Sequence, residues 1–315
     1  MTAAVDVAVV AYRRWDLTRS CLEHLARQTM EHRVTLCDNG CDEGTAERAA
    51  VEFPDVAVIR LERNMPYAIA CNRAVANGSA ELVVMMNNDV DVRPDFIERV
   101  VAPFAADPGV GSVGSLLLRP GEERIDSAGM VIDPTLAGFT RLRGRPRAEA
   151  DAARPGVTGP YGAAAAFRRA AWEEIGGLDE TIPAYCEDLD LALRLRQAGW
   201  PTALALDAVG VHIGGATFGY RSADQRRRAG YGRGYLLRRY GVLRTRAAVR
   251  ALVTEAIVVT GDLVISHDLA ALRGRLAGWR GAAGLPARTP PAAAALDQEL
   301  DFLQSLRLRR SSYER

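Results

Sequence analysis

Residues 82–91, which read Leu-Val-Val-Met-Met-Asn-Asn-Asp-Val-Asp, decide what kind of sheet this chain builds. The first five are all apolar, which is typical of a strand buried on both faces. The apolar run then ends abruptly in amides and carboxylates, and ligands of open α/β sheets bind at the carboxyl ends of the strands. Hard oxygen ligands at that edge suit a divalent cation that carries phosphate oxygens. An ordinary polar turn is the alternative, because Asn and Asp are also common turn residues.

Short apolar runs alternate with helical patterns on both sides of this stretch. We expect strands at 5–11, 34–37, 56–61, 81–86, 111–118, 163–167, 202–206 and 209–212. We expect helices at 16–28, 45–53, 68–77, 93–106, 169–175 and 189–198. This alternation predicts an α/β fold with a mostly parallel, Rossmann-like sheet flanked by helices.

Two parts of the chain are less regular. Residues 120–156 are rich in Gly, Pro, Arg and Asp, and we expect a loop that covers the cleft. The chain after residue 214 is basic and helical, with a linker at 281–295 and a last helix at 296–308. This tail is expected to pack on the body, to form a homodimer or to touch lipid, and no window has the length of a membrane span.

Composition limits the possible functions. The chain has 315 residues and a net charge of +1, so we expect no nucleic-acid partner. All 40 basic residues are arginine, which excludes a lysine Schiff base and a phosphate-loop lysine and indicates GC-rich, bacterial coding. Five scattered cysteines, with no signal peptide before Val5, indicate reduced thiols and a cytoplasmic location, either free or peripheral at the inner face of the membrane.

Two further polar sites add to the opening stretch. Glu187 and Asp188 precede an amphipathic helix, where carboxylates either complement the helix dipole or act as a general base. His212 ends a short strand and is followed by glycines, which fits a structural histidine or a ligand for a manganese-like ion.

In their order, these motifs resemble those of the family 2 glycosyltransferases with the GT-A fold, especially their bacterial rhamnosyltransferase-like branch. The resemblance covers about residues 5–218. The matching segments are 9–12, 37–45, 64–72, 86–89, 107–114, 158–163, 176–180, 185–191 and 212–216.

The resemblance implies a GT-A domain at 1–218, with a nucleotide-binding half at about 1–95 and an acceptor-binding half at 96–218. Residues 219–315 then form a mainly helical C-terminal extension. It also implies an inverting transfer from a nucleoside diphosphate sugar, with UDP- or dTDP-sugars favoured, to a hydroxyl-bearing acceptor. That acceptor is a glycan, a lipid-linked saccharide or a secondary metabolite.

The resemblance also carries residue roles onto this chain. Asp188 falls on the catalytic base, with Glu187 orienting it or binding acceptor, and Asp89 with His212 falls on the ligands of Mg²⁺ or Mn²⁺. Asp91 is expected to be solvated. The nucleotide-binding positions are Ala11, Tyr12, Asp38, Asn64, Asn72 and Asn88. The positions near donor sugar and acceptor are Gly162, Ala163 and Tyr185.

Two departures from the family pattern concern the donor side. Met65-Pro66-Tyr67 follows Asn64 where relatives usually have glycine, and Asn87 stands where the metal motif usually begins with Asp.

Two other functions remain as alternatives. A sugar-nucleotide pyrophosphorylase would need a Gly-rich phosphate loop and usually a lysine, and a non-catalytic nucleotide-sugar binding protein would share the fold without turnover.

Overall fold

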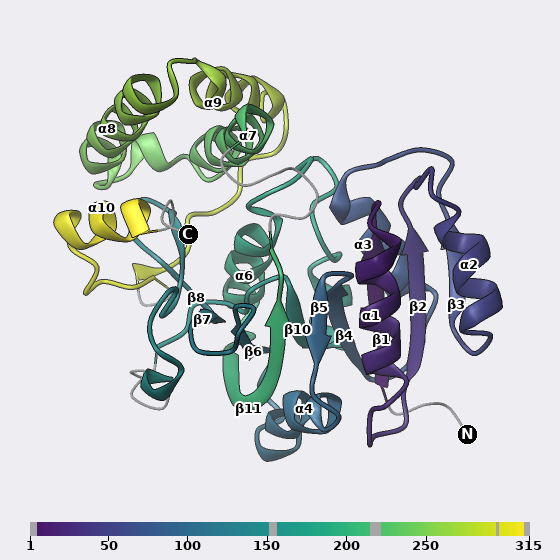
Figure 1. Ribbon diagram of the computed structural model, residues 1–315. Coiled ribbons are helices and arrows are strands. Elements are labelled where there is room, and N and C mark those ends of the chain that lie inside the picture. The colour runs from purple at the N-terminus through teal and green to yellow at the C-terminus, as the bar shows by residue number, and fades with distance from the viewer. Residues whose placement is uncertain (1–4, 151–155, 215–221, 294–295, 312–315) are drawn as a thin grey trace.

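A computed structural model describes residues 5–150, 156–214, 222–293 and 296–311 (Figure 1). Its strands are β1 (Val5–Ala11), β2 (Arg33–Asp38), β3 (Ala57–Arg60), β4 (Leu82–Asn87), β5 (Val90–Val92), β6 (Ser112–Leu118), β7 (Ile125–Ala128), β8 (Met130–Ile132), β9 (Gly138–Thr140), β10 (Ala164–Arg168) and β11 (Thr202–His212). Its α-helices are α1 (Trp15–Leu25), α2 (Thr45–Glu52), α3 (Tyr67–Ala76), α4 (Phe96–Ala106), α5 (Arg169–Glu174), α6 (Glu187–Gln197), α7 (Ala223–Arg239), α8 (Ala248–Ser266), α9 (Ala270–Gly281) and α10 (Phe302–Ser311). Single 3-10 turns are η1 (Arg147–Glu149) and η2 (Val242–Arg244).

The main sheet has the strand order β3-β2-β1-β4-β10-β6-β11-β5, and β7 pairs with β6. Strand β10 is antiparallel to both β4 and β6, and β11 is parallel to β6. Consequently β1, β2, β3, β4, β6 and β11 all run in one direction, which confirms the mostly parallel sheet. The carboxyl ends of β1, β4 and β11 therefore meet the amino end of β10 at one edge.

Both faces of the sheet are covered, which is why its central strands read as continuous apolar runs. In β1, Val7 and Val9 pack in one hydrophobic cluster with residues of α1 and α4. Their neighbours Ala8 and Val10 point to the other face and pack with residues of α3, α5 and α6. Burial on both sides fixes the strand register, because a shift by one residue would exchange the two faces.

Three expectations from the sequence are wrong in detail. The strands predicted at 202–206 and 209–212 are one strand, β11, whose register shifts between Ala205 and Val209. Residues 120–150 are not an irregular loop, because they hold β7, β8 and β9; residues 151–155 lie outside the described part. These strands of three or four residues are too short to produce a recognisable alternation. The last helix begins at Phe302 and not at 296.

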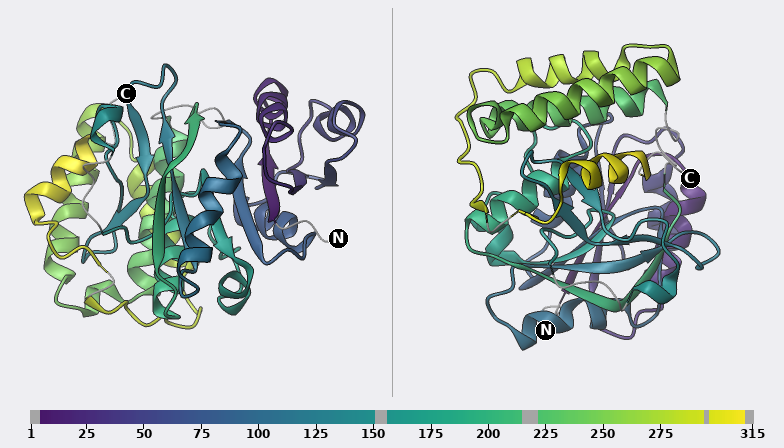
Figure 2. Two further views of the ribbon diagram at one scale, coloured as in Figure 1. Left: turned by 90° about the horizontal axis from the view of Figure 1, so that it is seen from below. Right: turned by 90° about the vertical axis from the view of Figure 1, so that its left-hand side faces the viewer.

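The described residues after 222 form four α-helices. Helices α7, α8 and α9 stack at one end of the sheet, and α10 lies between them and the sheet (Figures 1 and 2). Helices α7 and α9 touch through glycines. A Cβ on Gly274 would lie 2.0 Å from the carbonyl oxygen of Arg227, and one on Gly278 would lie 1.9 Å from that of Tyr231. Only glycine allows the two backbones to approach so closely.

The helical extension is docked on α6 and the β8–β9 hairpin. Tyr235 lies in α7, and Tyr240 directly follows it. Both are fully buried in a cluster with Leu189, Leu193 and Met130. The boundary predicted between residues 218 and 219 falls outside the described residues, so the division into domains stays a prediction. None of the helices described here combines the length and the apolar character needed to cross a membrane.

Candidate functional site

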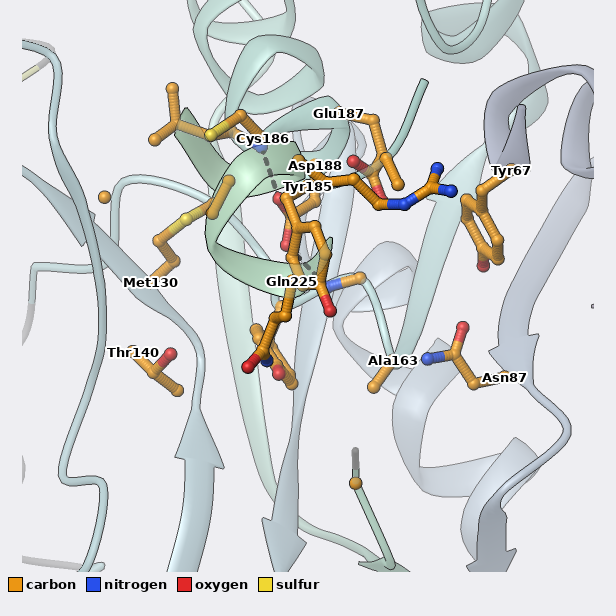
Figure 3. A pocket seen from close by; sticks show the side chains of 18 of the residues that line it. Tyr67, Asn87, Met130, Thr140, Ala163, Tyr185, Cys186, Glu187, Asp188 and Gln225 are labelled. Carbon is orange, nitrogen blue, oxygen red and sulfur yellow. Dashed lines mark hydrogen bonds between the residues drawn. The ribbon is translucent and has the colours of Figure 1, made fainter. Parts of the chain in front are cut away.

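A cavity of about 1020 Å³ opens at the edge where β1, β4 and β11 end. Its walls combine residues from the strand ends, the start of α6 and the helices after residue 222; Figure 3 shows Glu187 and Asp188 on one side and Tyr67 and Asn87 on the other. Ten of the predicted site residues line it: Tyr12, Asn64, Asn88, Asp89, Gly162, Ala163, Tyr185, Glu187, Asp188 and His212. The fold therefore gathers groups that are up to 200 residues apart in sequence.

A chain of three side chains forms the metal candidate. His212 Nδ1 lies 2.7 Å from Asp126 Oδ2 and donates to it, because a carboxylate can only accept. The opposite nitrogen, Nε2, thereby faces Asp89, whose Oδ1 is 3.4 Å away. Burial lowers the pKa of His212, but the hydrogen bonds to Asp126 and Asp89 outweigh it and raise that pKa to about 9.

Asp126 belongs to this group, and the sequence did not reveal it. It lies on β7, inside the segment expected to be a loop, and it is 5% exposed. Arg143 lies 3.3 Å from its other oxygen, and the ring of Tyr161 meets that of His212 edge to face. A carboxylate that fixes the tautomer and orientation of a histidine in this way is the usual support of a metal-binding imidazole.

The residues present fit a divalent cation held jointly with a substrate. Two ligands at right angles on an octahedral ion lie about 3 Å apart, close to the 3.4 Å between Asp89 Oδ1 and His212 Nε2. Across residues 5–150, 156–214, 222–293 and 296–311, no group of three or more His, Cys, Asp and Glu side chains is placed to hold a metal. The protein thus offers two ligands, and phosphate oxygens and water would complete the set, as is common for Mg²⁺.

The paired carboxylates begin α6 in an unusual backbone setting. Tyr185 and Cys186 precede them with φ values of 66° and 71°, a left-handed conformation that non-glycine residues rarely adopt. Asp188 Oδ2 accepts a hydrogen bond from the Gly162 N–H at 3.2 Å, and Oδ1 accepts one from the Leu189 N–H at 2.8 Å. These bonds hold the Asp188 carboxylate in one orientation at the cavity wall.

The two carboxylates differ in their surroundings. Burial, with the adjacent charge of Asp188, raises the pKa of Glu187 to about 8. Burial also raises the pKa of Asp188, although the N–H groups of Gly162 and Leu189 act in the opposite direction. Glu187 Oε2 is closed to solvent, and no described residue hydrogen-bonds to it. A buried polar atom of this kind is unusual unless a ligand or water pairs with it.

Tyr67 is a second residue that the sequence did not assign. It begins α3 directly after Pro66, and its side chain lines the cavity opposite Glu187 (Figure 3). Its hydroxyl is buried without a hydrogen-bond partner among the described residues. Burial, with the nearby Cys71 and carboxylates, raises its pKa well above the usual value, so the phenol stays protonated and can donate a hydrogen bond.

Three predicted nucleotide-binding residues do not line the cavity. Ala11 is buried in β1 beside Asp38, whose two oxygens accept from the N–H groups of Cys41 and Ala46. Asn72 instead hydrogen-bonds to both backbone polar groups of Leu178. The roles of these three residues in nucleotide binding stay predictions.

Neighbouring residues define that region further. Asn39 lines the cavity and exchanges two hydrogen bonds of 2.9 Å with the backbone of Met65, which fixes the loop after Asn64. Asp91 is not simply solvated, because its carboxylate accepts from Ser20 Oγ at 2.9 Å, away from the cavity.

The helical extension supplies the remaining wall of the cavity. Gln225, Arg226, Arg228 and Arg233 reach it from α7, and Arg275 and Arg309 reach it from α9 and α10. These contributions depend on how the extension packs on α6.

A family model described as "Glycosyltransferase like family 2" matches residues 3–232. An N-acetylglucosaminyl-diphospho-decaprenol L-rhamnosyltransferase of Mycobacterium tuberculosis is 28% identical over 236 residues, which are 67% of this chain and 76% of that protein. The O-antigen biosynthesis protein RfbC of Myxococcus xanthus is 29% identical over 219 residues, which are 63% of this chain and 16% of that much longer protein.

Solved structures share the fold. A mannosyltransferase, PcManGT of Pyrobaculum calidifontis in complex with GDP-Man and Mn²⁺, has a TM-score of 0.55 at 19% identity and covers 100% of this chain and 82% of its own. GalNAc-T7 with UDP, GalNAc and Mn²⁺ has a TM-score of 0.60 at 12% identity, covering 81% of this chain and 51% of its own. At these identities the likeness concerns the fold, and it confirms the predicted GT-A type.

Proposed function

The chain belongs to the family 2 glycosyltransferases, and we propose that it is an inverting enzyme that uses a UDP- or dTDP-sugar. The acceptor is a hydroxyl group of a glycan, a lipid-linked saccharide or a secondary metabolite. One observation carries this proposal: a single cavity holds Asp188, fixed by the Gly162 N–H, together with the Asp89–His212 pair. The reaction needs a group that accepts the proton of the acceptor hydroxyl and a site that binds the diphosphate of the donor.

Asp188 acts as the general base in this proposal. It takes the proton of the acceptor hydroxyl while that oxygen forms a bond to the anomeric carbon. The bond from this carbon to the diphosphate breaks on the opposite side, which inverts the anomeric configuration and releases a nucleoside diphosphate. Burial, which raises the pKa of Asp188, makes it a stronger base than an exposed aspartate.

The donor side rests on strand ends and adjacent loops. Tyr12 offers a ring for stacking at the end of β1, and Asn64 and Asn88 offer amide groups to the nucleotide. Asp89 and His212 would hold Mg²⁺ or Mn²⁺, which when bound neutralises negative charge on the departing diphosphate. Asp126 keeps the His212 ring in place for that task.

The relative from Mycobacterium tuberculosis guides the first assay. A thymidine diphosphate rhamnose and a short-chain N-acetylglucosaminyl-diphospho-lipid form the starting pair, followed by a panel of UDP-, dTDP- and GDP-sugars, each with Mn²⁺, Mg²⁺ or a chelator. We expect a nucleoside diphosphate and a glycoside of inverted configuration. Pyrophosphate formed from a nucleoside triphosphate and a sugar phosphate would support a pyrophosphorylase instead. Tight nucleotide binding without loss of the sugar to any acceptor or water would support a binding protein.

We propose a cytoplasmic location for this reaction. All five cysteines are unpaired thiols, and four of them are buried. Thiols in this state are in keeping with a reducing compartment.

A further inference from the structure

Helix α8 presents its apolar side to solvent and its polar side to the protein. The residues that face inward recur at helical spacing: Ala251, Thr254 and Glu255 are buried, and Val258 and Asp262 line the cavity. The large side chains that face outward are all apolar. They are Val249 (73% exposed), Leu252 (56%), Val253 (45%), Ile257 (45%), Leu263 (43%), Val264 (65%) and Ile265 (66%).

The inward polar groups of α8 have specific partners in the protein. Glu255 accepts hydrogen bonds from Arg233 at 2.6 Å and Arg275 at 2.7 Å. Arg250 donates to Ser305 Oγ and to the carbonyl oxygen of Leu300. These contacts fix the rotation of the helix, so its apolar side cannot turn inward without breaking them.

This arrangement is the reverse of an ordinary surface helix, which turns charged residues to water. A contiguous apolar surface of this kind usually marks a site of interaction. Figure 1 shows α8 at the outer edge of the helical extension, away from β1 and β2. No described residue covers the seven outward side chains enough to bury them.

The exposed charged residues just before α8 and on α9 are arginines. Arg244 and Arg246 precede α8, Arg273 and Arg280 lie on α9, and all four are exposed. None of the four forms an ion pair with a carboxylate in the part of the chain that the structure describes. Residues 244–280 contain three acidic residues, and none adds negative charge to the outward face. Glu255 and Asp262 face inward, and Asp268 pairs with Arg226.

We propose that the outward face of α8 lies on the surface of a bilayer that contains anionic lipids. Apolar side chains would enter the boundary between headgroups and acyl chains, and the flanking arginines would meet the lipid phosphates. A second copy of the chain is a poorer occupant, because a two-fold contact of this face would bring unpaired arginines toward arginines.

The proposal does not depend on the reaction proposed above, since it rests on the exposure and charge of α8 and α9. It does have a consequence for access to the cavity. The side of α8 opposite the apolar face carries Val258 and Asp262, which line the cavity. A bilayer under α8 therefore lies one helix diameter from the cavity wall, about 10 Å.

Flotation of the full chain with vesicles tests the proposal. We expect the protein to float with vesicles of phosphatidylcholine and phosphatidylglycerol, and much less with phosphatidylcholine alone. The double variant Leu252→Asp/Ile265→Asp should bind on the order of tenfold or more weakly. Arg244→Gln/Arg246→Gln should also bind more weakly, and its binding should depend less on salt because two of the four arginines are gone. Val51→Asp is the matched control, because Val51 is 81% exposed on α2, and its binding should not change.

All substituted side chains are exposed, so circular dichroism and the unfolding temperature should match those of the unmodified protein. Failure of the unmodified protein to float with anionic vesicles overturns the proposal. Equal losses in the α8 variant and in Val51→Asp would also overturn it. A dimer in analytical ultracentrifugation that Leu252→Asp/Ile265→Asp dissociates, without vesicle binding, would assign the face to self-association instead.

Discussion

Replacing Glu187 and Asp188 one at a time separates the roles of two adjacent carboxylates. Burial and the adjacent charge of Asp188 raise the pKa of Glu187 to about 8, so the protonated form predominates at pH 7. Glutamine closely imitates the protonated form. We therefore expect Glu187→Gln to keep kcat at pH 7 within about threefold, because most of the enzyme already carries an uncharged Glu187. Asp188→Asn removes the base and should lower kcat by about 10²–10⁴-fold.

Glu187→Gln should also stabilise the protein. The pKa of Glu187 is raised in the folded state, so folding loses stability as pH rises from its ordinary value of 4.5 toward 8. Between the ordinary pKa of 4.5 and pH 7, a span of about 2.5 pH units, the lost stability amounts to about 3 kcal/mol. Glu187→Gln removes this cost, and its gain in the free energy of unfolding should be large at pH 7 and small at pH 4.5.

The assay follows kcat from pH 5.5 to 9 for both variants, with urea unfolding at pH 4.5 and 7 and calorimetry of UDP or dTDP binding. Nucleotide binding should survive in Asp188→Asn, which separates loss of the base from loss of the site. A large loss of kcat in Glu187→Gln at pH 7, with activity kept in Asp188→Asn, would make Glu187 the base and refute the reasoning. So would a Glu187→Gln protein with no gain in stability at pH 7.

Three other substitutions test separate parts of the structure. Asp126→Asn should weaken Mn²⁺ binding in the presence of nucleotide by about 10–100-fold, measured by calorimetry, with nucleotide binding without metal unchanged; equal Mn²⁺ affinity would contradict the support of His212. Glu255→Gln should cost about 3 kcal/mol of unfolding free energy at pH 7. Burial alone would raise the pKa of Glu255, but Arg233 and other arginines outweigh it and lower this pKa from 4.5 to about 2. That stability is present above pH 4.5 and is lost as pH falls through 2, so an equal cost at pH 2 and 7 would argue against it. Gly274→Ala should lower the unfolding temperature and expose the extension to protease, whereas Gly261→Ala, whose Cβ meets open space, should be neutral or stabilising; the same effect in both would discount the α7–α9 contact.

Long, regular elements were predictable from the sequence because their pattern is repeated many times. The strand predicted at 5–11 has the bounds of β1, and the strands predicted for β2, β3 and β4 differ from the structure by one residue at each end. The antiparallel insertion of β10 was not predicted, because the direction of a strand in a sheet depends on pairing between distant segments and leaves no local trace. The same holds for β11, whose bulge interrupts its apolar run and makes one strand read as two.

The site was predictable where single residues carry the chemistry and hidden where packing does. Asp89, Asp188 and His212 stand at recognisable strand or helix ends, and the structure brings them to one cavity. Asp126 lies in a four-residue strand, and the hydroxyl of Tyr67 is notable only because burial leaves it without a partner. Such properties belong to the folded environment and not to the residue type.

The cavity is closed by two separate stretches of sequence. Its strand-end groups come from residues before 215, whereas the arginines opposite come from α7, α9 and α10, and the family match stops within α7 at residue 232. The two walls therefore lie on separate stretches of the gene, and buried contacts such as that of Tyr240 with Asp190 join them in the fold. We expect chimaeras that exchange the segment from residue 222 onward between relatives to change the lining of this wall while Asp89 and Asp188 stay in place.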